Sequence, residues 1–100
     1  MAILTLGNIL DDLQTAEAGL HKFERRYWMS SGHFYELYSH GLLDNGDHLE
    51  DFAEWSGHYK LERKRKAALE KLSRQRLEQL QRQSGGIIQL APQEPVLELA

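Results

Sequence analysis

The sequence contains no cysteine and only two prolines, at positions 92 and 95. The absence of cysteine excludes a disulfide framework and a thiolate metal site. Because no proline precedes position 92, no proline interrupts a helix over most of the chain. No apolar run approaches the roughly 20 residues that a membrane-spanning helix requires. The opening residues, MAILTLGNIL, lack the basic start of a secretory signal, so we expect a cytoplasmic protein without a membrane partner.

Charge is distributed unevenly along the 100 residues, although the formal net charge is only −3. Residues 1–59 hold ten Asp or Glu against three Lys or Arg, a charge of −7. Residues 60–82 hold nine Lys or Arg against three Glu, a charge of +6. A chain this short is a single domain and buries only part of its apolar surface. An acidic part followed by a basic segment predicts two different working surfaces.

A first helix is predicted over residues 8–27. Asn8 is a suitable N-cap, and Asp11 and Asp12 would lie in the first turn, where negative charge interacts favourably with the helix dipole. Apolar residues recur at steps of three, four or seven and define the buried face. These residues are Leu10, Leu13, Leu20, Phe23 and Tyr27.

A second, shorter helix is predicted after Ser30 or Ser31, either of which can cap it. Gly41 ends this helix, because glycine tolerates the left-handed conformation that often follows a last helical turn. A loop with a turn at Asn45-Gly46 comes next. The apolar positions of the second helix are Phe34, Leu37 and Tyr38.

The third helix is the longest, with a pattern that runs from an N-cap at Asp47 to about Ser84. About 36 residues at about 1.5 Å per residue would span roughly 54 Å. This length exceeds the diameter of a compact domain of this size. Part of the helix is therefore expected to project from the rest of the molecule.

Together these patterns predict an all-α fold, in which two short helices pack on the N-terminal half of a long third helix. Residues 1–60 would form a helical head, residues 61–84 a projecting basic continuation of the third helix, and residues 85–100 an extended tail. We expect the core of the head to consist of Phe34, Leu37, Tyr38, Phe52, Trp55 and Tyr59. The histidines and carboxylates of residues 33–59 would then lie on the solvent-exposed surface of the head.

Two stretches carry more apolar surface than the predicted head can cover. In the basic helix, Leu69, Leu72, Leu77 and Leu80 resume a partial apolar stripe. In the tail, the two prolines and the alternation near the end favour an extended conformation of the kind that docks on another protein. We predict that the binding residues of the tail are Ile87, Ile88, Leu90, Val96, Leu97 and Leu99.

The sequence gives little support for metal binding or catalysis. His48 with Asp51 and Glu54 with His58 are helical pairs, but neither belongs to a recognisable zinc motif. No nucleophile elbow, phosphate-binding glycine loop or cysteine nucleophile is present. We therefore assign no catalytic, metal or cofactor residue and expect no enzymatic activity.

Nucleic-acid binding is an alternative for the basic segment. The basic residues of this segment could neutralise several phosphates of DNA. They would then be the DNA contacts of a regulator that dimerises through the leucine stripe. These residues are Arg63, Lys64, Arg65 and Lys66. Glutamates recur every eight residues among these bases, however, and two of them are well placed for pairs along the helix. The same basic face could instead meet an acidic protein or the acidic head of another copy.

Residues 23–61, FERRYWMSSGHFYELYSHGLLDNGDHLEDFAEWSGHYKL, resemble a family of small bacterial proteins that are frequent in cyanobacteria. The shared pattern is a Met-Ser-Ser segment, an acidic turn and Phe-x-Glu-Trp at the start of a long helix. This sequence departs from it at Trp28, where small residues are usual, and in its many histidines. The matching residues are Tyr27, Met29, Ser30, Ser31, Phe34, Tyr35, Gly41, Leu43, Asp51, Phe52, Glu54 and Trp55.

The resemblance implies an antitoxin-like partner of a small toxin in a type II toxin–antitoxin module. We accordingly expect a non-enzymatic protein that binds and neutralises a cognate toxin, of ribonuclease type, by occlusion. The alternative is a DNA-binding transcriptional regulator that contacts operator DNA through the basic helix. The two functions are compatible, because one protein can bind a toxin and repress its own operon.

Overall fold

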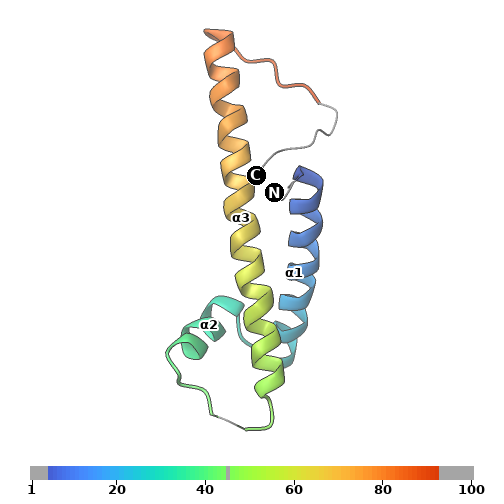
Figure 1. Ribbon diagram of the computed structural model, residues 1–100, viewed down its shortest axis with the longest axis vertical. Helices are drawn as coiled ribbons and strands as arrows, with labels where there is room; N and C mark the ends of the chain where they lie inside the picture. The colour runs from blue at the N-terminus through green and yellow to red at the C-terminus, as the bar shows by residue number, and fades with distance from the viewer. Residues whose placement is uncertain (1–4, 45, 93–100) are drawn as a thin grey trace.

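The computed structural model describes residues 5–44 and 46–92, which form three α-helices (Figure 1). Helix α1 spans Leu6–Tyr27, α2 spans Ser31–Ser39 and α3 spans Leu49–Ser84. α1 runs alongside α3, and α2 lies across the beginning of α3 (Figure 1). The predicted all-α fold with a long third helix is confirmed, and the two described ranges contain no strand.

Helix α1 begins before the position that the sequence pattern predicts. Thr5 is the N-cap, and its Oγ1 accepts a hydrogen bond from the backbone N–H of Asn8 at 2.9 Å. The prediction that Asn8 caps this helix is therefore wrong, and Asp11 and Asp12 lie beyond the first turn. Threonine and asparagine both satisfy unpaired N–H groups at a helix start, so propensity alone does not distinguish the two caps.

The buried face of α1 also differs from the prediction at one position. Ile9 is fully buried, whereas Leu10, which was expected to face inward, is 47% exposed. Adjacent residues of a helix point about 100° apart, so only one of these two side chains can face α3. The buried residues follow steps of three and four and are Ile9, Leu13, Ala16, Leu20 and Phe23.

A tight turn connects α1 to α2. Trp28 ends α1 in the left-handed conformation, with φ 56° and ψ 47°, and its side chain is 92% exposed. Ser30 caps α2 by accepting a hydrogen bond from the backbone N–H of His33 at 3.3 Å. Gly41, with φ 67°, follows the end of α2 as predicted. The left-handed region costs a non-glycine residue roughly 1–2 kcal/mol, so Trp28 is held there against its local preference.

Helix α3 starts without a side-chain cap. Its N-cap is His48, which makes no capping hydrogen bond, so the predicted role of Asp47 as cap is wrong. Glu50 and Asp51 in the first turn supply negative charge where the helix dipole favours it. The helix is continuous through the basic stretch 60–66 and ends at Gly85, whose φ is 64°.

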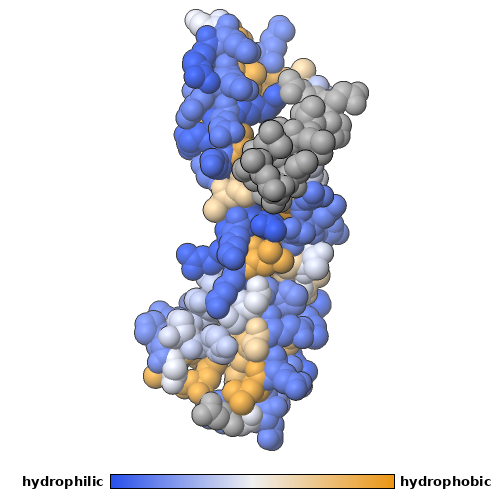
Figure 2. Space-filling view, viewed as in Figure 1, coloured by the Kyte–Doolittle hydropathy of each residue, from blue (hydrophilic) through white to orange (hydrophobic). Residues whose placement is uncertain are grey.

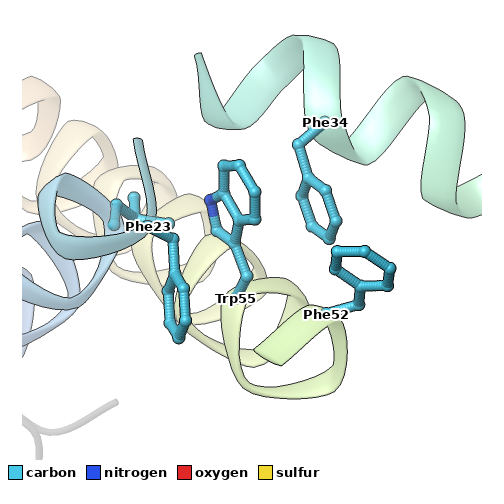
Figure 3. Close-up of a cluster of buried hydrophobic side chains, with 5 residues drawn as sticks. Phe23, Phe34, Phe52 and Trp55 are labelled. Atoms are coloured by element: carbon cyan, nitrogen blue, oxygen red, sulfur yellow. The ribbon is translucent and has the colours of Figure 1, made fainter. Parts of the chain in front are cut away.

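An aromatic core joins the three helices around Trp55, which is 1% exposed (Figure 3). The indole ring stacks on Phe34 of α2 with ring centroids 3.9 Å apart, and on Phe23 of α1 at 5.7 Å. The buried cluster is Leu20, Phe23, Phe34, Phe52 and Trp55. Of the predicted core, Phe34, Phe52 and Trp55 are buried, Tyr38 and Tyr59 pack against the cluster, and Leu37 is half-buried.

A chain of hydrogen bonds also links the three helices inside this core. Trp55 Nε1 donates to Ser31 Oγ at 2.8 Å. The hydroxyl and backbone N–H of Ser31 in turn donate to the carboxylate of Glu24, at 2.8 and 3.0 Å. Ser31 and Trp55 belong to the Met-Ser-Ser and Phe-x-Glu-Trp segments, so these motif residues hold the head together.

The pairing of α1 with α3 continues beyond residue 60. Three contacts define the alignment of the two helices: Lys22 pairs with Glu54, Gly19 faces His58, and Asp12 bonds to Arg65 at 2.6 Å. Residue numbers fall along α1 as they rise along α3, so the two helices are antiparallel. Continuing this register places the first residues of α1 opposite the region of Leu72. The part of α3 that extends past α1 is therefore about residues 73–84, three turns or about 18 Å.

Candidate partner-binding surface

The candidate surface is the part of the chain beyond α1, residues 73–92, which we call the distal arm. It comprises the end of α3 and the segment after Gly85, which turns back beside α3 (Figure 1). The guanidinium of Arg76 donates a hydrogen bond to the carbonyl oxygen of Ala91 at 3.5 Å. This contact between residues fifteen apart places the segment next to the helix.

The four leucines predicted to bind a partner lie in different environments. Leu69 and Leu72 are half-buried near the start of α1. Beyond α1, Leu80 is half-buried and Leu77 is 42% exposed. Leu69, Leu72 and Leu80 share one helix face, and Leu77 lies beside that face. The distal arm therefore contains only the last two of the four leucines.

The segment after α3 exposes most of its apolar surface. Residues 87–92 adopt no helical conformation, as expected. Ile87 is 95% exposed and Leu90 is 75% exposed, whereas Ile88 is half-buried. Exposure of large aliphatic side chains close together is characteristic of an interaction site. The remaining predicted residues, Val96, Leu97 and Leu99, lie outside the described residues.

The four basic residues predicted to contact nucleic acid are mostly engaged within the protein. Arg65 is half-buried and bonds to Asp12, and Lys66 lies 3.6 Å from Glu62. The guanidinium of Arg63 lies over the ring of Tyr59, 5.7 Å from its centroid. Lys64 is exposed. The structure therefore divides the RKRK stretch among different faces of α3.

The histidine pairs considered for metal binding form no metal-binding cluster. In the described part of the chain, no three His, Asp or Glu side chains gather closely enough to hold an ion. Glu54 and His58 do meet, at 3.6 Å. The imidazole of His58 lies against Gly19 of α1, where a Cβ atom would approach its Cδ2 and Nε2 atoms to 2.5 Å. His58 therefore packs between α1 and α3.

Tyr27 and Asp51 form a polar contact between the end of α1 and the start of α3. The Tyr27 hydroxyl donates a hydrogen bond to Asp51 Oδ2 at 2.6 Å, and Arg26 lies 3.3 Å from the same oxygen. Burial raises the pKa of Tyr27, and the hydrogen bond to Asp51 and the charge of Asp51 raise it further. The neutral phenol is therefore the form that the folded protein favours.

Because the pKa of Tyr27 is higher in the folded protein than its usual value of about 10, the unfolded chain loses this proton first as the pH rises. We expect this contribution to stability to be complete below about pH 10 and to be lost at higher pH. Tyr27→Phe should remove this part of the alkaline decline and, by losing a hydrogen bond to a carboxylate, cost about 1.5 kcal/mol at neutral pH. Urea titrations from neutral pH to pH 11 would measure both effects. If the difference in free energy of unfolding between wild type and Tyr27→Phe were the same from neutral pH to pH 11, the raised pKa of Tyr27 in the folded protein would be contradicted.

A second exposed apolar region, which the sequence analysis did not identify, lies at the opposite end of the molecule from the distal arm. Leu42 is 68% exposed and Leu49 is 48% exposed. Figure 2 shows apolar surface at this end of the molecule. A groove of about 230 Å³ lies beside it, lined by Tyr38, Gly41, Leu43, Asp44, Leu49 and Phe52. The sequence signal was the pair Leu42-Leu43 in a loop that otherwise consists of glycine and polar residues.

None of the three described helices is apolar enough over a sufficient length to cross a membrane. Comparisons with protein-family models, curated proteins and solved structures found no match to this chain.

Proposed function

We propose that this chain is a non-enzymatic interaction protein, an antitoxin that binds and neutralises a small ribonuclease-type toxin. The observation that carries the proposal is the distal arm, where α3 extends beyond α1 and Leu77, Ile87 and Leu90 are exposed. The head in contrast is held by a stacked aromatic core and a hydrogen-bond chain. The head is therefore stabilised by its own contacts, whereas the exposed apolar side chains of the distal arm would be covered by binding to a partner.

The mechanism that fits this arrangement is occlusion. An extended segment with apolar side chains can occupy a groove or add to the edge of a sheet, and it needs no catalytic group of its own. A ribonuclease toxin has a basic cleft for RNA. Carboxylates of the antitoxin complement such a cleft and accelerate the encounter. The exposed Asp44, Asp47 and Glu50 at the opposite end from the distal arm carry such charge.

Deleting residues 85–100 should weaken toxin binding by at least about tenfold, about 1.4 kcal/mol, while the head keeps its thermal stability. The deletion removes exposed Ile87 and Leu90 but no residue of the buried aromatic cluster. Binding to the product of the adjacent reading frame would be measured by calorimetry, and neutralisation by growth of cells that co-express both proteins.

A matched pair of substitutions controls for loss of an apolar side chain. Leu90→Asp changes an exposed residue of the distal arm, and Leu42→Asp changes one of similar exposure at the other end. The first should impair neutralisation and the second should not. Full neutralisation by both the deletion and Leu90→Asp would refute the role of the distal arm.

DNA binding is the second candidate, and one observation favours it. Lys60, Lys64 and Lys71 are exposed, and their spacing of four and seven residues places them on one side of α3. Replacing all three with Glu should abolish operator binding at low salt, whereas the wild-type affinity should fall steeply with increasing salt. A filter-binding titration would test this, and no binding by the wild type at 50 mM salt would eliminate the candidate.

A further inference from the structure

The end of the molecule opposite the distal arm is acidic. Residues 36–54, which we call the acidic end, contain six Asp or Glu and no Lys or Arg. They include the second half of α2, the loop and the first turns of α3. Asp44, Asp47 and Glu50 are exposed there. The last turns of α1 lie at the same end, where Lys22 pairs with Glu54 and Arg26 pairs with Asp51. The negative charge that this end presents is therefore mainly that of Asp44, Asp47 and Glu50.

The other half of α3 is basic. Residues 71–82 contain four Lys or Arg and one Glu, a charge of +3. Lys71, Arg74 and Arg82 are exposed and lie on one side of the helix, which Glu78 shares. Arg74 also lies 3.3 Å from Glu70. Roughly 30 residues of α3 separate Arg82 from the acidic end, a distance of about 45 Å. The charges are therefore separated along the longest dimension of the molecule, which is 58 Å.

Both ends also expose apolar side chains. At the acidic end, Leu42 and Leu49 flank the groove that Tyr38 and Phe52 line. In the distal arm, Ile87 and Leu90 are exposed. The hydrogen bond from Arg76 to Ala91 keeps the latter two beside the end of α3. They therefore cannot reach the groove of their own molecule.

We propose that two copies of the chain pair side by side in antiparallel orientation. In this arrangement the basic part of α3 and the distal arm of each copy lie against the acidic end of the other copy. Opposite charges then meet at both ends, and Ile87 and Leu90 cover the apolar surface around Leu42 and Leu49. This inference concerns the free protein and does not depend on the proposed toxin.

Charge and symmetry favour this arrangement over the other ways to pair two copies. A parallel dimer would place the two basic segments together and the two acidic ends together, which is repulsive. A head-to-tail contact satisfies one end of each molecule and leaves the other free, so it would continue into a filament. The antiparallel pair uses the same contact twice and closes on itself.

Two charge-reversed variants test the proposal. Lys71→Glu, Arg74→Glu and Arg82→Glu together make the basic part acidic, and Asp44→Lys, Asp47→Lys and Glu50→Lys together make the acidic end basic. We expect each variant alone to be monomeric and an equimolar mixture of the two to form a heterodimer. Wild-type dimerisation should weaken about tenfold between 50 mM and 500 mM NaCl, because salt screens exposed charges. Sedimentation velocity would measure the mass, with circular dichroism to confirm that each variant is folded.

The absence of native cysteine allows a second test of the orientation. Leu42→Cys and Ile87→Cys variants, mixed and oxidised, should form a disulfide-linked pair with about twice the 11.6 kDa mass, more readily than either variant alone. Preferential linkage of Ile87→Cys to itself would show a parallel pair and overturn the proposal. A wild type that remains monomeric at 50 mM NaCl, or whose mass grows beyond a dimer, would overturn it as well.

Discussion

Replacing Trp55 with Ala is expected to lower the free energy of unfolding by about 3–5 kcal/mol. The side chain is 1% exposed and stacks between rings of α1 and α2, so its removal leaves a cavity at the junction of all three helices. It also removes the donor that bonds to Ser31. Domains of this size are stable by only about 5–15 kcal/mol, so a large fraction of the stability would be lost. Urea unfolding followed by far-ultraviolet circular dichroism would measure the change.

The second tryptophan of the chain is a matched control. Trp28 is 92% exposed, so Trp28→Ala should change the free energy of unfolding by no more than about 0.5 kcal/mol. Trp28→Gly should stabilise the protein by about 1 kcal/mol, because glycine adopts the left-handed conformation without the steric cost. Equal stability of Trp55→Ala and Trp28→Ala would contradict the assignment of Trp55 to the core.

Gly19→Ala is expected to destabilise the protein by up to about 2 kcal/mol, although alanine is the better helix former. The new Cβ atom would lie 2.5 Å from the imidazole of His58, so the ring would have to move out from between α1 and α3. Overpacking of this kind costs about 1–3 kcal/mol, against a gain of about 1 kcal/mol in helix propensity. Thermal and urea unfolding of the purified variants would give the net effect.

A double-mutant cycle separates the two contributions. In a His58→Ala background the clash is absent, so Gly19→Ala should instead stabilise the protein by about 1 kcal/mol. Gly57→Ala is the matched control, since a Cβ there meets no atom within 4 Å, and it should stabilise the protein in both backgrounds. If Gly19→Ala had the same sign with and without His58, the close contact between α1 and α3 at this position would be disproved.

Both proposed interactions use the distal arm, and this has a consequence for the protein in solution. A toxin bound over Ile87 and Leu90 would cover the residues that are proposed to reach the acidic end of a second copy. Binding of the toxin and antiparallel pairing would then exclude each other. The variant in which Lys71, Arg74 and Arg82 are replaced by Glu distinguishes the two interactions. It leaves unchanged both the apolar residues of the distal arm and the carboxylates that are proposed to attract the toxin.

The helices were predictable because local signals agree with tertiary packing. Glycines at 41 and 85 end α2 and α3 with positive φ, and Ser30 caps α2. Two of the errors occurred where two residues met the same local requirement. Thr5 and Asn8 can both cap α1, and Ile9 and Leu10 are both apolar neighbours. Packing of α1 in the tertiary structure decided that Ile9 is the buried residue.

The candidate partner-binding surface was also predictable only in part. The sequence indicated that the leucines of α3 and the apolar tail exceed what a small head can cover, because that inference requires only composition and spacing. It could not indicate that α1 pairs with α3 as far as Arg65, because the bond between Arg65 and Asp12 joins residues 53 apart. The extent of the distal arm therefore followed from the structure.

The sequence by itself determined the number of helices, their approximate ends and the separation of charge along the chain. These properties depend on residues close to one another in the chain, through periodicity, caps and the distribution of Lys, Arg, Asp and Glu. Only the tertiary structure decided that Ser31 links Trp55 to Glu24, that Gly19 accommodates His58, and which apolar residues remain exposed. These contacts depend on how one helix is rotated and aligned against another, and no local pattern encodes that orientation.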